Sequence, residues 1–180
     1  MKEQLESYMS VQNFSASRRS VTLTYSPISS YLQKQGAALH QNCSAEYFPS
    51  GEELFQKLLD DLTSAKRFIF LEYFIISEGQ LWNSILHILE EKAQQGIDIR
   101  ILYDDAGCLS TLPSGTAEEL RQKGIHCAVF NPIHPRLNTI LNYRDHRKLC
   151  IIDAEIAYTG GANLSDEYVN LIQKHGHWKD

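Results

Sequence analysis

The sequence lacks a long apolar segment. Its longest apolar run, from Phe68 to Ile76, is nine residues long and contains Glu72, whereas about 20 residues are needed to cross a bilayer. The first ten residues, MKEQLESYMS, also lack the apolar core that a secretory signal peptide requires. We therefore expect the 180-residue chain as given to be soluble, with any membrane attachment made through segments outside it.

Cysteine is scarce and shows no paired pattern. The four cysteines are Cys43, Cys108, Cys127 and Cys150. They have neither C-x-x-C spacing nor the spacing of a secreted disulfide framework. Cys127 and Cys150 lie in apolar runs, which favours buried free thiols and a reducing cytoplasm.

The overall charge is negative. A net charge of −5 argues against nonspecific binding to nucleic acid by bulk charge. One basic cluster interrupts this pattern within thirteen positions, and consists of Arg136, Arg144, His146, Arg147 and Lys148. An acidic chain with one basic site is what an enzyme for an anionic substrate would show.

The order of helical and strand-like patterns predicts an α/β fold. Three amphipathic segments alternate with three apolar runs, in the order 51–65, 68–76, 81–96, 97–103, 116–124 and 125–130. Two further strands, at 148–153 and 156–159, are joined by a hairpin-sized connection. We predict a mixed, largely parallel β-sheet flanked by helices on both faces.

The amino-terminal part differs from the rest of the chain. Residues 1–45 are a polar, serine-rich lead-in with a short helix expected at 28–39, and we expect them to be weakly ordered. Residues 46–180 hold the strand and helix patterns described above and form the second predicted domain.

The chemistry is concentrated in the segment HRKLCIIDAEIAYTGGAN, at 146–163. His146 and Lys148 are two residues apart at the start of a strand, so their side chains should point to the same side. A base or nucleophile beside a fixed cation suits attack on a phosphate diester. Asp153 lies five residues beyond Lys148, so it should face the other side and brace the motif through hydrogen bonds.

The second half of this segment offers a cradle for an anion. Gly160 and Gly161 let backbone N–H groups approach an anion closely. Asn163 adds a neutral side-chain donor. We therefore predict that Lys148, Gly160, Gly161 and Asn163 bind the phosphate of a substrate.

Other polar residues are predicted to be structural. Glu72 lies inside an apolar run, so it should either pair with a cation near the site or mark the end of the strand, and we favour a structural partner role. Asp104 and Asp105 follow a strand and are expected to cap or shape a loop rather than bind a metal. His175 and His177 have His-x-His spacing without further ligands nearby, so no metal is expected.

The pattern H-x-K-x4-D-x6-G-G-x-N resembles the signature of the phospholipase D superfamily. Its residues are most similar to those of the bacterial cardiolipin synthases. The resemblance covers 47–180, through LEYFII, YDDAG, NYRDHRK, TGGANLSDEY and HWKD. It implies a catalytic motif of His146, Lys148 and Asp153, in which His146 is the nucleophile or its acid partner and passes through a phosphohistidine without a cofactor. The ending HWKD resembles the family's W-x-D segment, which implies that Asp180 orients His146.

Two departures from the family bear on function. Family members of this type carry two copies of the motif and a membrane-spanning amino terminus, and the chain shows one motif and no such segment. The resemblance therefore implies a half-domain, truncated at its C-terminal end and inactive alone, that condenses two phosphatidylglycerols to cardiolipin and glycerol. The second motif would come from the same full-length chain or from a second copy. The full-length protein would lie at the cytoplasmic face of the cell membrane.

Two alternatives stay open. One is a one-motif homodimeric phosphodiesterase or nuclease of the same superfamily; the negative charge and the stop at HWKD count against it. The other is an inactive fragment that binds anionic lipid. The leading interpretation has phosphatidylglycerol or another anionic phospholipid as its partner, and no nucleic acid.

Overall fold

The computed structural model describes residues 26–37, 43–133, 142–174 and 176–179. The chain divides into two compact units, Met1–Glu46 and Tyr47–Asp180. Helix α2, Ser26–Lys34, belongs to the first unit and exposes Ile28, Tyr31 and Leu32. The assignment of residues 1–45 as a weakly ordered lead-in stays a prediction.

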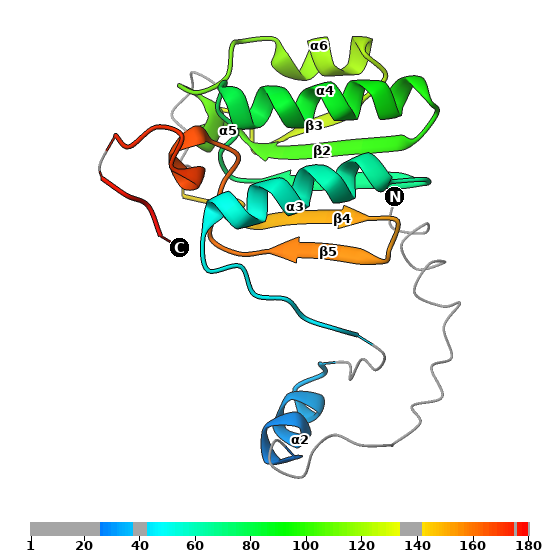
Figure 1. Ribbon diagram of the computed structural model, residues 1–180, viewed down its shortest axis with the longest axis vertical. Helices are drawn as coiled ribbons and strands as arrows, with labels where there is room; N and C mark the ends of the chain where they lie inside the picture. Colours follow the sequence, from blue (N-terminus) through cyan, green and yellow to red (C-terminus); the bar gives the residue numbers. More distant parts are fainter. Residues whose placement is uncertain (1–25, 38–42, 134–141, 175, 180) are drawn as a thin grey trace. The chain divides into compact units, whose positions relative to one another are not determined.

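The second unit is built on a five-stranded sheet (Figure 1). In sheet order its strands are β3 (His126–Phe130), β2 (Asp98–Asp104), β1 (Phe68–Tyr73), β4 (Lys148–Ile152) and β5 (Ile156–Thr159). Strands β1, β2 and β3 are parallel, and β4 runs antiparallel to both β1 and β5. The predicted α/β class and mixed sheet are confirmed.

Three helices and one face of the sheet form a single apolar core (Figure 1). The helices are α3 (Gly51–Ser64), α4 (Gln80–Gln94) and α6 (Thr116–Gln122). Their buried side chains share this core with alternate strand residues such as Ile69 and Leu71 of β1. Helix α3 begins where Ser50 accepts the N–H of Glu53, at 3.4 Å, as its capping-box spacing predicts.

The opposite face of the sheet carries no helix in the described part of the chain. Its side chains are all at least partly exposed, and include Phe68, Phe70, Glu72, Arg100, Leu102, Ala128, Leu149 and Ile151. The second helical layer of the prediction is therefore not found among the described residues. The reason is that the connections β1–α4–β2 and β2–α6–β3 step in the same direction, and right-handed crossovers then place both helices on one face.

The chain after β5 returns to the carboxyl end of β1. Asp166, at the start of the 3₁₀ helix η2 (Asp166–Val169), accepts the N–H groups of Gln80 and Leu81 at 2.9 and 2.7 Å. It thereby caps α4, whose own N-cap residue is Gly79. A Cβ on Gly79 would lie 2.6 Å from the Asp166 carboxylate, so a larger residue here would displace that carboxylate. These contacts anchor the segment that follows the glycine pair.

Candidate active site

His146 and Lys148 lie where β4 begins, beside the end of β1. Lys148 pairs with Tyr73 across the two antiparallel strands and is 5% exposed, whereas His146 is exposed. The Lys148 Nζ donates a hydrogen bond to the His146 carbonyl oxygen at 2.7 Å. The structure therefore brings a buried cation and an accessible imidazole together at one edge of the sheet.

Phe74 is a residue of this site that sequence reasoning missed. Its ring centroid lies 4.6 Å from that of His146, with 56° between the ring planes, and 5.3 Å from Lys148 Nζ. A tilted aromatic pair and a cation over a ring are both favourable contacts. The sequence showed Phe74 only as part of an apolar run, and the antiparallel pairing of β1 with β4 makes it the common contact of His146 and Lys148.

Asp153 lies at the other end of β4, in the turn to β5. Its carboxylate accepts the backbone N–H groups of Lys66, Arg67 and Phe68 at 2.8, 2.8 and 2.9 Å. Burial opposes ionisation, but these three donors outweigh it and lower the pKa of Asp153 below its ordinary value. This bonding joins the end of β4 to the start of β1, which is the geometry that a bracing role requires.

The glycine pair follows β5 and is exposed. A Cβ built on Gly160 would meet no atom within 4 Å. Packing within the chain therefore does not require a glycine at this position. An open approach to the backbone is what a ligand-binding turn needs.

Asn163 is buried, and both ends of its amide are bonded within the protein. Its Oδ1 accepts the N–H of Ile75 at 3.0 Å, and its Nδ2 donates to the Tyr168 hydroxyl at 2.8 Å. The structure thus gives Asn163 an anchoring role between the glycine turn and the chain after β1. The predicted contact with phosphate would need the second Nδ2 hydrogen.

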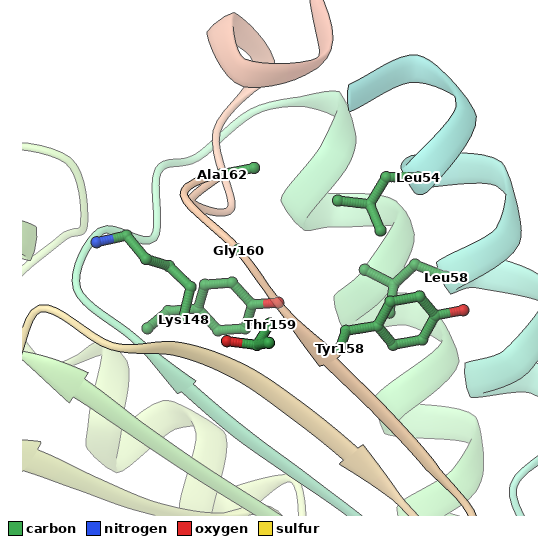
Figure 2. A pocket seen from close by; sticks show the side chains of 8 residues that line it. Leu54, Leu58, Lys148, Tyr158, Thr159, Gly160 and Ala162 are labelled. Atoms are coloured by element: carbon green, nitrogen blue, oxygen red, sulfur yellow. The ribbon is translucent and has the colours of Figure 1, made fainter. Parts of the chain in front are cut away.

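A small cleft of about 30 Å³ opens beside Lys148. It is lined by Leu54, Leu58, Tyr73, Lys148, Tyr158, Thr159, Gly160 and Ala162. Figure 2 shows Leu54 and Leu58 of α3 on one side of it and Lys148 on the other. The apolar stem of Lys148 lines this hollow, while its Nζ points away from the two leucines (Figure 2).

Glu72 finds its predicted cationic partner on the open face of the sheet. The Nη2 atom of Arg147 lies 2.7 Å from Glu72 Oε1, but Glu72 Oε1 accepts no hydrogen bond from it. Arg147 instead donates hydrogen bonds to the Asp145 carboxylate at 3.0 and 2.9 Å. Desolvation and the nearby Asp145 carboxylate raise the pKa of Glu72 to about 7. Hydrogen bonds from Arg147 hold the pKa of Asp145 well below its ordinary value.

Some predicted features fall outside the described residues. Asp180 and His175 are among them, so the proposed contact of Asp180 with His146 stays a prediction. Across the described ranges, no three His, Cys, Asp or Glu side chains gather in a group that could hold a metal ion. No helix in those ranges is long and apolar enough to span a membrane.

Curated relatives show sequence similarity over most of the chain. A cardiolipin synthase of Listeria welshimeri is 40% identical over 149 residues, which cover 83% of this chain and 31% of that protein. A cardiolipin synthase 2 of Staphylococcus epidermidis is 35% identical over 179 residues, covering 99% of this chain and 36% of that protein. The chain thus spans about one third of the length of the curated relatives it matches.

Solved structures are similar in fold. NucT from Helicobacter pylori matches with a TM-score of 0.50 and 19% identity, over 65% of this chain and 70% of that chain. Nuc from Salmonella typhimurium, a phospholipase D family member, matches with a TM-score of 0.47 and 21% identity, over 63% of this chain and 66% of that chain. At this identity the likeness to NucT shows the fold alone.

The family described as "cardiolipin synthase, phospholipase D-like domain" matches residues 58–175. This range holds His146, Lys148, Asp153 and the glycine turn. Since the match covers more than half of the chain, the chain belongs to the cardiolipin synthase family of phospholipase D-like domains.

Proposed function

We propose that this chain supplies one half of a phosphatidyl-transfer site, in which His146 attacks the phosphorus of an anionic phospholipid. The observation that carries the proposal is the meeting of His146 and Lys148 on the Phe74 ring, next to an apolar cleft. The imidazole is exposed and can reach a substrate, while the ammonium is held in place by the His146 carbonyl. A fixed cation in a partly dry site stabilises charge that develops on phosphate oxygens.

The proposed reaction has two displacements. In the first, a ring nitrogen of His146 forms a bond to phosphorus as the bond to the glycerol oxygen of one phosphatidylglycerol breaks. In the second, the hydroxyl of another phosphatidylglycerol displaces His146 and forms cardiolipin. The glycerol takes up one proton and the incoming hydroxyl loses one, so a single acid–base group can serve both steps. That group would be the histidine of a second motif, from the same full-length chain or from a second copy.

The charge of the chain favours a lipid over a nucleic acid as substrate. The net charge is −5, whereas a nuclease gains affinity from surrounding positive charge. Relatives named cardiolipin synthase support the same substrate class.

Lipid transfer tests the proposal. The chain is assayed alone, and as a chimera in which it replaces the matching region of the Listeria welshimeri cardiolipin synthase. Products from phosphatidylglycerol vesicles are measured by mass spectrometry. We expect cardiolipin from the chimera, little or none from the chain alone, and an acid-labile phosphatidyl adduct on His146 after rapid quenching.

Matched variants identify the nucleophile. His146→Gln should abolish both the product and the adduct, whereas His126→Gln, which changes an exposed histidine on β3, should leave both unchanged. Cleavage of nucleic acid by the chain alone would support the nuclease alternative. Vesicle binding with no turnover in the chimera would support the inactive alternative. Either result would contradict the proposal.

A further inference from the structure

A buried carboxylate outside the motif bonds both to the chain just before His146 and to the short segment after β2 that packs against Phe74. Asp104, the last residue of β2, is 1% exposed and accepts four hydrogen bonds, from the backbone N–H groups of Ala106, Gly107 and Asp145 and from the Arg144 guanidinium. We infer that Asp104 is a positioning residue for His146. The inference rests on the proposed function only in taking His146 as the reacting group.

The first contact of Asp104 acts through the backbone that leads into the motif. Its Oδ2 accepts the N–H of Asp145 at 3.0 Å, and Asp145 immediately precedes His146. Its Oδ1 accepts from Arg144 Nη1 at 3.2 Å, and Arg144 also donates to the Asn131 carbonyl at 3.0 Å. Asp104 thus sets the direction in which the chain reaches His146.

The second contact acts through the ring that lies beside His146. The Oδ1 of Asp104 accepts the N–H groups of Ala106 and Gly107, at 2.9 and 3.3 Å, in the short helix α5 (Asp105–Cys108). Gly107 packs against the backbone of Phe74 so closely that a Cβ would lie 2.0 Å from the Phe74 carbonyl oxygen. The Phe74 ring in turn contacts the His146 imidazole.

These two contacts converge on one imidazole. The Oδ2 of Asp104 binds the backbone N–H of Asp145, just before His146. The Oδ1 binds α5, which packs against Phe74, the residue whose ring lies beside His146. A residue that only capped α5 would bond to Ala106 and Gly107, but it would not need the bonds to Arg144 and Asp145. A buried carboxylate persists only where hydrogen bonds compensate its desolvation, and here part of that compensation comes from the motif segment itself.

Asp104→Asn tests the inference in the 180-residue chain, because it keeps the volume and replaces one acceptor by a donor. The readout is the imidazole NMR signal of His146, assigned with His146→Gln. We expect this signal to shift and broaden or to split into two, and the rate of modification by diethyl pyrocarbonate to change severalfold. The signals of His87 and His126, which lie on α4 and β3, should stay in place.

Asp166→Asn is the matched control. Asp166 is also a buried carboxylate that accepts two backbone N–H groups, but at the start of α4. This variant should lower Tm without moving the His146 signal. The inference is overturned if Asp104→Asn leaves that signal unchanged, or if Asp166→Asn moves it equally.

A milder variant covers the case in which Asp104→Asn does not fold. Arg144→Gln breaks the contact of Arg144 with Asp104 Oδ1 and should displace the same His146 signal by a smaller amount. An unmoved signal in this variant also overturns the inference. Because this readout needs no turnover, a failure of the transfer assay and a failure of the positioning inference are distinguishable.

Discussion

The two ends of β4 are each held by a buried aspartate, but the two aspartates bond to different parts of the molecule. At the carboxyl end, Asp153 accepts three backbone N–H groups from the start of β1. At the amino end, Asp104 accepts from Asp145, next to His146, and from α5, which supports Phe74. The same kind of hydrogen bond therefore joins two strands at one end and holds the segments next to His146 at the other.

The comparison also separates stability from reactivity. A change at the Asp153 end should loosen the sheet, because only backbone groups lose their partner. A change at the His146 end should alter chemistry first, because it moves the exposed imidazole of His146 or removes the cation beside it. Five variants test this division.

Lys148→Met should have the largest effect, and it acts at the reactive end. The substitution keeps most of the side chain's volume but removes the cation from a 5% exposed position. Transfer by the chimera should fall roughly 10²–10³-fold, the usual cost of one group that stabilises charge in a transition state. The free energy of unfolding should change by no more than about 1 kcal/mol, because removal of a buried charge and loss of its hydrogen bond to the His146 carbonyl oppose each other. Lipid product and urea unfolding measure the two effects, and Lys92→Met, which changes a lysine bonded to the Ala65 carbonyl, is the control.

Asp153→Asn should have the largest effect on stability. In the variant, an NH₂ group replaces one of the two carboxylate oxygens, so at least one of the three backbone N–H groups loses its acceptor. This loss should lower the free energy of unfolding by about 2–3 kcal/mol. The urea midpoint should fall accordingly, while the His146 NMR signal of the folded chain keeps its position. A displaced His146 signal with unchanged stability would reverse the roles assigned to the two ends of β4.

Gly107→Ala and Gly160→Ala compare two glycines near the reactive end. A Cβ on Gly107 would lie 2.0 Å from the Phe74 carbonyl, so α5 must move, at a cost of about 1–2 kcal/mol. A Cβ on Gly160 meets nothing within 4 Å, so stability should stay within about 0.5 kcal/mol of the parent. If the glycine turn binds phosphate, Gly160→Ala should still slow transfer in the chimera. Equal destabilisation by both variants would contradict this distinction.

Glu72→Gln should have the smallest effect and changes how stability depends on pH. The pKa of Glu72 is about 7 in the folded chain, against an ordinary value of 4.5. Between these values the unfolded chain has lost the proton that the folded chain keeps, so this group makes stability fall as pH rises from about 4.5 to about 7. In Glu72→Gln, the urea midpoint should depend less on pH between about 4.5 and about 7. The exposed-surface variant Glu118→Gln should not, and an equal flattening there would contradict the assignment.

Most secondary structure could be predicted because it depends on local spacing. The leucines of α3 repeat at helical period, and the strand predicted at 148–153 is found as β4, Lys148–Ile152. The first strand was predicted to continue to Ile76, but it ends at Tyr73. At Phe74 the backbone approaches Gly107 closely, and this contact between distant segments has no signal in the apolar run itself.

The sequence by itself determined which groups are available for chemistry. An imidazole, a cation two residues away and a glycine pair beside an asparagine keep their properties and their spacing in any fold. Only the tertiary structure decided what surrounds them. The order of the strands placed α4 and α6 on one face, and the antiparallel pairing of β1 with β4 brought Phe74 to His146. The parallel pairing of β2 with β1 brought Asp104 to the residue before His146. Contacts between segments far apart in the chain depend on how strands pair, and the spacing of residues within one segment does not encode that pairing.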